Sequence, residues 1–116
     1  KVNPTGIKLP NNLYIRYPEL KVVTKDGKNR KVYKSRKGPV NIWGGGVVEN
    51  VVQALARIIV GEQMFKISQK FRVALTVHDS VVVTVKKSKV DEALAFVTKT
   101  MSTPPDWCKS LPVSFL

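Results

Sequence analysis

The sequence has very little cysteine, and Cys108 is the one thiol among its 116 residues. A single cysteine excludes an internal disulfide and a zinc site built from cysteines alone, so a bound metal is expected to have oxygen ligands. No apolar stretch approaches the roughly 20 residues of a membrane span, and the first residues do not resemble a signal peptide. We therefore expect a soluble protein of a reducing compartment, with no membrane partner.

Acidic residues are also scarce, since eight Asp and Glu face 20 Lys and Arg, giving a net charge of +12. The imbalance is concentrated in residues 1–37, which hold eleven basic residues but only Glu19 and Asp26 as acids, a net charge of +9. A block of this kind favours a polyanionic partner, because each neutralised phosphate releases counterions. The alternative is a solubilising surface, and charge alone does not decide between them.

The length of 116 residues suits one domain with a real core. We therefore expect residues 1–116 to form a single domain. The chain starts without Met and stops on an apolar end, so we also expect it to be part of a longer protein.

The first half of the sequence has the alternation of half-buried strands. Residues 13–17, 20–24 and 31–34 alternate apolar and polar side chains. Asp26-Gly27 favours the positive backbone angles of a tight turn, which predicts a basic hairpin over residues 20–35. Gly38-Pro39 is expected to break the chain.

The second half predicts two helices around another hairpin. Apolar residues at helical spacing indicate a long helix over residues 47–66, and β-branched runs predict a hairpin over residues 71–86 with His78-Asp79-Ser80 at its tip. A second helix is expected over residues 88–101, capped by Ser88. This order predicts an α+β fold, an antiparallel sheet with two main helices packed on one face.

Asp79 is the leading candidate for chemistry. Two stiff, largely buried strands would hold its carboxylate at an exposed tip, which is how a rigid metal ligand is made. The alternative is that Asp79 is an ordinary turn residue, because Asp is a common turn former.

The long predicted helix carries a polar stripe of Asn50, Gln53 and Arg57 at positions i, i+3 and i+7. Amide and guanidinium donors can address the minor groove, where base pairs of every sequence present similar acceptors. A solvated helix face is the alternative. The preceding run Trp43 to Gly46 lacks the Lys-Ser/Thr ending of a P-loop and is expected to be a flexible connection.

Several motifs occur in an order that resembles one protein family. They are Leu9-Pro10, Tyr17-Pro18, the run WGGGVVENVVQALAR over residues 43–57, Val77-His78-Asp79-Ser80 and Thr103-Pro104-Pro105-Asp106-Trp107. Together they resemble the C-terminal part of phage family A DNA polymerases, over about residues 7–113. The resemblance implies part of the palm subdomain, downstream of the fingers, in a protein acting in the cytoplasm of a bacterial host.

The resemblance also implies roles for individual residues. Asp79 would be a ligand of two Mg²⁺ ions, shared with a carboxylate absent from this chain, and His78 would lie against the primer terminus. Gln53 and Asn50 would contact primer and template in the minor groove, with Arg57 on the same surface. The implied partners are primer–template DNA, deoxynucleoside triphosphates and the rest of the polymerase chain. The basic residues Lys28, Arg30 and Lys31 are expected to contact DNA phosphates.

Some positions depart from the family pattern. Ser80 stands where the family commonly has Glu, and Ile58 stands where Asp often follows the Ala-Arg pair. Two alternatives to an active polymerase palm therefore remain open. One is a non-catalytic nucleic-acid-binding module, and the other is a degenerate polymerase remnant. The isolated chain is expected to be inactive in every case, because one ligand cannot hold two ions.

Overall fold

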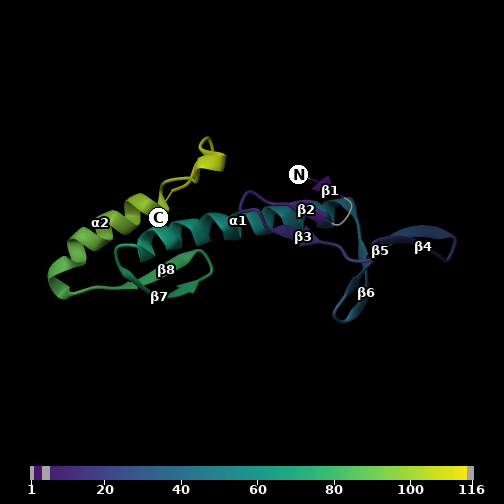
Figure 1. The fold of residues 1–116 in the computed structure, drawn as a ribbon, viewed down its shortest axis with the longest axis horizontal. Coiled ribbons are helices and arrows are strands. Elements are labelled where there is room, and N and C mark those ends of the chain that lie inside the picture. Colours follow the sequence, from purple (N-terminus) through teal and green to yellow (C-terminus); the bar gives the residue numbers. More distant parts are fainter. Residues whose placement is uncertain (1, 4–5, 115–116) are drawn as a thin grey trace. The chain divides into compact units, whose positions relative to one another are not determined.

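The computed structural model describes residues 2–3 and 6–114, and the chain divides into two compact units, Lys1–Leu55 and Ala56–Leu116. The described residues form antiparallel sheets and two main helices, which confirms the predicted α+β class (Figure 1). The strands are divided among three small sheets rather than joined in one. Within the described ranges, no helix is both long and apolar enough to cross a membrane.

The first unit contains two of these sheets. The strands β1 (Val2–Asn3), β2 (Gly6–Lys8) and β3 (Tyr14–Arg16) pair antiparallel in chain order. The approach of β2 to β3 requires a glycine, because a Cβ on Gly6 would collide with the carbonyl oxygen of Ile15. The second sheet contains β4 (Lys21–Lys25), β5 (Lys28–Ser35) and β6 (Gly38–Ile42), also in chain order.

The basic hairpin predicted over residues 20–35 is confirmed as β4 and β5. Asp26 (φ 53°) and Gly27 (φ 73°) both have positive φ and form its two-residue turn. The predicted break at Gly38-Pro39 is wrong, because β6 begins there and pairs with β5. Pro39 is tolerated because β6 is an edge strand, where a missing backbone N–H costs little.

The long helix α1 spans Gly44–Ser68, so it begins before the predicted Val47 and ends slightly later. The expectation that Gly44 to Gly46 form a flexible connection is wrong, because they make the first helical turn. The N–H of Val47 donates to the carbonyl oxygen of Trp43 at 3.1 Å. The Trp43 ring lies against Gly45, where any Cβ would collide with it. The glycines therefore make room for the indole at the start of the helix.

The second unit contains part of α1, the hairpin of β7 (Arg72–Val77) and β8 (Ser80–Thr84), and the helix α2 (Val90–Met101). Its buried apolar residues are Ile58, Ile67, Ala93, Met101 and Pro105. The second predicted helix is confirmed, but its predicted cap is wrong. Ser88 lies inside a 3-10 turn, Lys87–Lys89, and the residue at the cap, Lys89, makes no side-chain capping hydrogen bond.

The apolar residues of α2 are only partly buried. Ala93 and Met101 are buried, whereas Leu94 is 60% exposed. A second 3-10 turn, Asp106–Cys108, follows the helix and brings the Trp107 indole N–H to 3.2 Å from both carboxylate oxygens of Glu62 on α1. This contact fixes the segment after α2 against the long helix.

Candidate functional site

Asp79 lies in the turn of the β7–β8 hairpin, as the sequence predicts. Val77 pairs with Ser80, so His78 and Asp79 form a two-residue turn, and Ser80 belongs to β8 rather than to the tip. His78 adopts a left-handed conformation with φ 54°. A positive φ at the first residue of a two-residue hairpin turn is ordinary turn geometry, and Asp26 has the same conformation in the β4–β5 turn. The turn therefore holds Asp79 at a defined place at the tip of the hairpin.

The strands that support this turn are more exposed than expected. They alternate half-buried and exposed residues, and Leu75, Val77 and Val82 are 51%, 51% and 45% exposed. The prediction of largely buried strands is therefore wrong. The pairing register shifts between Val73 and Leu75, which marks a bulge at Ala74. Backbone pairing and the short turn, rather than deep burial, set the position of Asp79.

A cavity of about 480 Å³ lies beneath the tip of the hairpin. Its walls come from α1, from the start of β8, from the end of α2 and from the segment that follows: Ala56, Ile59, Val60, Gln63, Asp79, Ser80, Val81, Met101, Val113 and Ser114. Most of this lining is apolar, and Asp79 is the one charged side chain in it. The carboxylate thus borders a hollow that is otherwise suited to packing against apolar or uncharged groups.

Gln63 is the buried polar residue of this cavity, with 3% of its surface exposed. Its amide nitrogen donates to the carbonyl oxygens of Met101 at 3.1 Å and Thr103 at 3.3 Å. Met101 is the last residue of α2, where a helix has no intrahelical donors left for its carbonyls, and Thr103 lies two residues beyond. Gln63 therefore ties α1 to the end of α2.

Sequence reasoning missed this role of Gln63. The pattern that could have found it is the spacing of Ile59, Gln63 and Ile67 at i, i+4 and i+8, which places the amide on the apolar side of the helix. A polar residue on such a face must find hydrogen-bond partners when it is buried.

The metal ligands present in the described residues do not make a complete site. No group of three or more His, Cys, Asp or Glu side chains in that part of the chain is arranged to hold an ion. Asp79 is an exposed carboxylate without a neighbouring acid in its cavity. Mg²⁺ requires near-octahedral oxygen coordination, so Asp79 alone offers only a small part of a binding site.

The helix residues expected to contact DNA are all exposed. The Asn50 amide donates to the Tyr17 hydroxyl at 3.0 Å, and the Tyr17 ring packs edge-on against Tyr33. The Gln53 amide donates to a Glu49 carboxylate oxygen at 3.1 Å, one turn earlier on α1. Asn50 and Gln53 belong to the first unit, whereas Arg57 belongs to the second.

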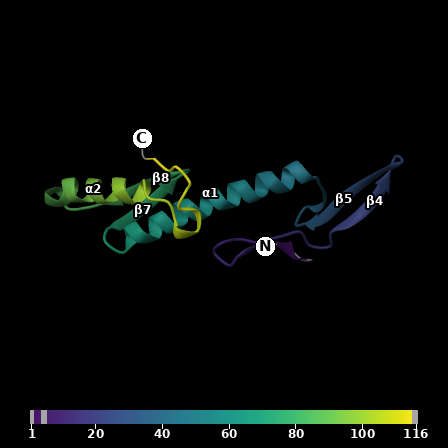
Figure 2. The same cartoon turned by 90° about the horizontal axis from the view of Figure 1, so that it is seen from above.

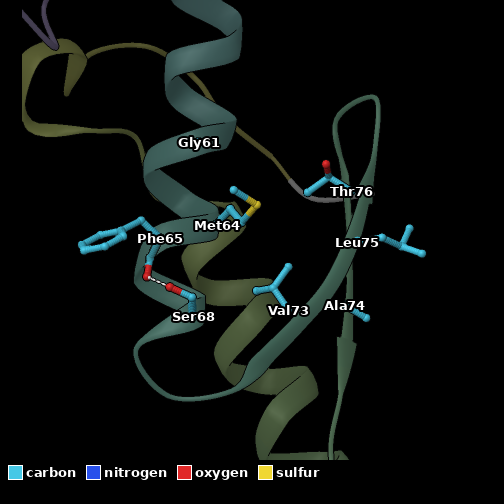
Figure 3. Close-up of a pocket in the computed structure, with 8 residues that line it drawn as sticks. All are labelled: Gly61, Met64, Phe65, Ser68, Val73, Ala74, Leu75 and Thr76. Atoms are coloured by element: carbon cyan, nitrogen blue, oxygen red, sulfur yellow. Dashed lines mark hydrogen bonds between the residues drawn. The ribbon is translucent and has the colours of Figure 1, made fainter.

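A second hollow of about 480 Å³ lies between α1 and β7, within the second unit. Figure 3 shows Met64 and Val73 between the helix and the strand, whereas Leu75 points away from the helix. The Ser68 hydroxyl donates to the carbonyl oxygen of Phe65 at 2.6 Å, near the end of α1. This hollow is lined mainly by apolar side chains and has no charged residue, so it offers no chemistry of its own.

Comparison with known proteins gives one informative similarity. The chain is similar to a DNA polymerase of Bacillus phage SP02, with 29% identity over 116 residues that cover 93% of this chain and 18% of that protein. The chain therefore spans less than one fifth of the length of that relative. No protein-family model matches the chain, and no solved structure matches it. The similarity supports a relationship to DNA polymerase.

Proposed function

We propose that this chain is a piece of a phage-type family A DNA polymerase and that it carries the catalytic hairpin of the palm subdomain. The observation that carries the proposal is the position of Asp79, in a two-residue turn beside His78 and at the border of a cavity. The similarity to a phage DNA polymerase along 93% of the chain supports it independently.

In this proposal Asp79 would hold catalytic magnesium together with a carboxylate from elsewhere in a longer protein. Bound magnesium would supply stabilisation of the negative charge on the primer 3′ oxygen and on the leaving pyrophosphate. The chain's own contribution is to place one carboxylate at a fixed point. No nucleophilic side chain is needed, because positioning and electrostatics dominate phosphoryl transfer.

The remaining site residues have roles around the primer terminus. His78, next to Asp79 in the turn, would lie against the terminal nucleotide of the primer. Gln53 and Asn50 would donate to minor-groove acceptors, with Arg57 serving the same surface. An amide nitrogen carries two hydrogens, so the bond of Asn50 to Tyr17 uses one of them and fixes the direction of the other.

The proposed substrates are primer–template DNA and deoxynucleoside triphosphates, and the site would operate in the cytoplasm of an infected bacterium. Ser80 begins β8 at a position where the family commonly has Glu. The proposed mechanism therefore assigns no accessory carboxylate to that position.

The test uses the full-length protein that contains this chain. Asp79→Asn should abolish nucleotide incorporation while primer–template binding stays nearly intact, because the amide keeps the shape and loses the charge that holds magnesium. A matched control is Asp106→Asn, since Asp106 is 99% exposed and 4.0 Å from Lys109. This control should keep normal activity. Near-normal incorporation by Asp79→Asn would remove Asp79 from the catalytic site.

A non-catalytic nucleic-acid-binding module is the second candidate. The observation that favours it is a lone carboxylate combined with a strongly basic first unit. A degenerate polymerase remnant would give the same behaviour. Both alternatives predict a full-length protein that binds DNA but incorporates no nucleotide even with Asp79 unchanged.

A further inference from the structure

The hairpin of β4 and β5 sorts its charges onto one face. Side chains directly opposite each other in an antiparallel pair lie on the same side, as do residues two apart along a strand. The register pairs Lys25 with Lys28, Val23 with Arg30, and Lys21 with Val32. One side of the hairpin therefore carries four cations, Lys21, Lys25, Lys28 and Arg30, which we call the basic face.

The opposite side of the hairpin has a different character. It carries Val22, Thr24, Asn29 and Lys31, and the Thr24 hydroxyl donates to the Asn29 side-chain oxygen at 2.7 Å. Lys31 is the one cation among these residues. The three basic residues expected from the sequence to contact DNA are thus divided, with Lys28 and Arg30 on the basic face and Lys31 behind it.

Among the residues that the structure describes, the cations of the basic face have no ion-pair partner, and Asp26 in the turn is the one acid between Lys25 and Lys28 in sequence. All four side chains are exposed. Lys25 and Lys28 are directly opposite each other, an arrangement that destabilises a hairpin because like charges repel. An anionic partner would remove this repulsion.

The hairpin is also held in a defined shape. Its turn residues Asp26 and Gly27 have the positive φ angles of a tight turn, and β4 and β5 lie side by side (Figure 2). The strand β6 pairs along the other edge of β5. At its base, the Lys34 N–H donates to the Pro18 carbonyl oxygen at 2.8 Å and the Lys34 ammonium pairs with Glu19 at 3.2 Å. A preorganised surface loses less conformational entropy on binding.

We propose that the basic face of the β4–β5 hairpin binds the phosphate backbone of duplex DNA without reading its sequence. Side chains two residues apart on a strand are about 7 Å apart, so the face offers separated cations rather than one point of charge. The basic face presents three lysine ammonium groups and one arginine guanidinium, and both kinds of cation bind phosphate. The amide of Asn29, which could bond to bases, is on the other side. The choice of duplex DNA rests on the proposed polymerase function.

The test measures binding of the purified chain to a labelled duplex over a range of salt concentrations. Arg30→Gln should make the slope of log affinity against log salt shallower by about 0.9, because one phosphate contact is lost. Its neighbour Lys31→Gln removes the same charge from the opposite side and should leave the slope nearly unchanged. Comparing these two variants distinguishes binding at one face of the hairpin from an effect of the chain's net charge.

A triple variant extends the comparison. Replacing Lys21, Lys28 and Arg30 with Gln should make the slope of log affinity against log salt shallower by about 2.7. Raising the salt from 50 to 200 mM should then weaken binding roughly 40-fold less in this variant than in the unchanged chain. The matched control removes three exposed lysines of the second unit, Lys66, Lys87 and Lys99. Amide chemical shifts of Val23 and Val32 would verify that the hairpin of each variant is folded.

Several results would overturn the proposal. Equal effects of Arg30→Gln and Lys31→Gln would show that the two sides do not differ. An equal loss in the triple variant of the second unit would mean that total charge alone drives binding. Equal affinity for heparin or for anionic lipid vesicles would refute a duplex-DNA surface. Because the assay needs no nucleotide incorporation, face-selective binding would stand even if Asp79→Asn left catalysis unchanged.

Discussion

Replacing Gln63 tests how the long helix is joined to the end of α2. The Gln63 amide is 3% exposed and donates to two carbonyl oxygens, at 3.1 and 3.3 Å. Gln63→Met keeps nearly the same volume and removes both donors. Each lost hydrogen bond costs about 1 kcal/mol, so the free energy of unfolding of the second unit should fall by about 2 kcal/mol.

Gln63→Ala should have a larger effect than Gln63→Met. It removes the same two hydrogen bonds and also leaves a space where the side-chain carbons were packed, so the total loss should be about 3 kcal/mol. Lys66→Ala is the control on the same helix and in the same unit. Lys66 is exposed, so its truncation should cost less than about 0.5 kcal/mol.

The assay must report on the second unit alone, because two compact units need not unfold together. Trp107 belongs to that unit and donates to Glu62, whereas Trp43 is 71% exposed in the first unit. In a Trp43→Phe background, the fluorescence of Trp107 in a urea titration follows the second unit. If Gln63→Met and Lys66→Ala changed the unfolding free energy of the second unit equally, the inferred role of Gln63 would be refuted.

Two further predictions concern activity. The isolated chain, given magnesium, primer–template and all four deoxynucleotides, should extend nothing, because Asp79 is the one acidic residue that lines its cavity and the described residues contain no group of three or more metal ligands. Template-dependent extension that Asp79→Asn abolishes would contradict this. In the full-length protein, Gln53→Ala should weaken discrimination against mismatched primer ends, measured as the ratio of matched to mismatched extension, because a minor-groove donor is lost. An unaltered ratio would indicate a solvated helix residue.

Local residue chemistry was sufficient to predict several elements of this fold. Asp26-Gly27 favours a tight turn whatever surrounds it, since its backbone angles are intrinsic to those residues. The β-branched runs on either side of His78-Asp79 predict a hairpin for the same reason, and its turn contains Asp79 as expected. The long helix was visible in the periodicity of its apolar residues, although its start was placed too late.

Other features depended on partners that are distant in the sequence. Gly38-Pro39 reads as a break, yet β5 offers a strand with which β6 can pair. Gly44 to Gly46 become helical against their intrinsic preference, and the Trp43 ring packs against Gly45 and Gly46. The polar residue Gln63 is buried because two carbonyl oxygens at the end of α2 accept its hydrogen bonds.

The candidate functional surfaces also have features that the sequence predicts and features that depend on the tertiary structure. The sequence by itself determined that Asp79 would lie in a turn between two strands and that the first third of the chain would be strongly basic. Only the tertiary structure decided that Lys28 and Arg30 share a face with Lys21 and Lys25, and that Lys31 does not. The reason is physical: composition counts charges, whereas the pairing register determines which side chains lie on the same side of a sheet.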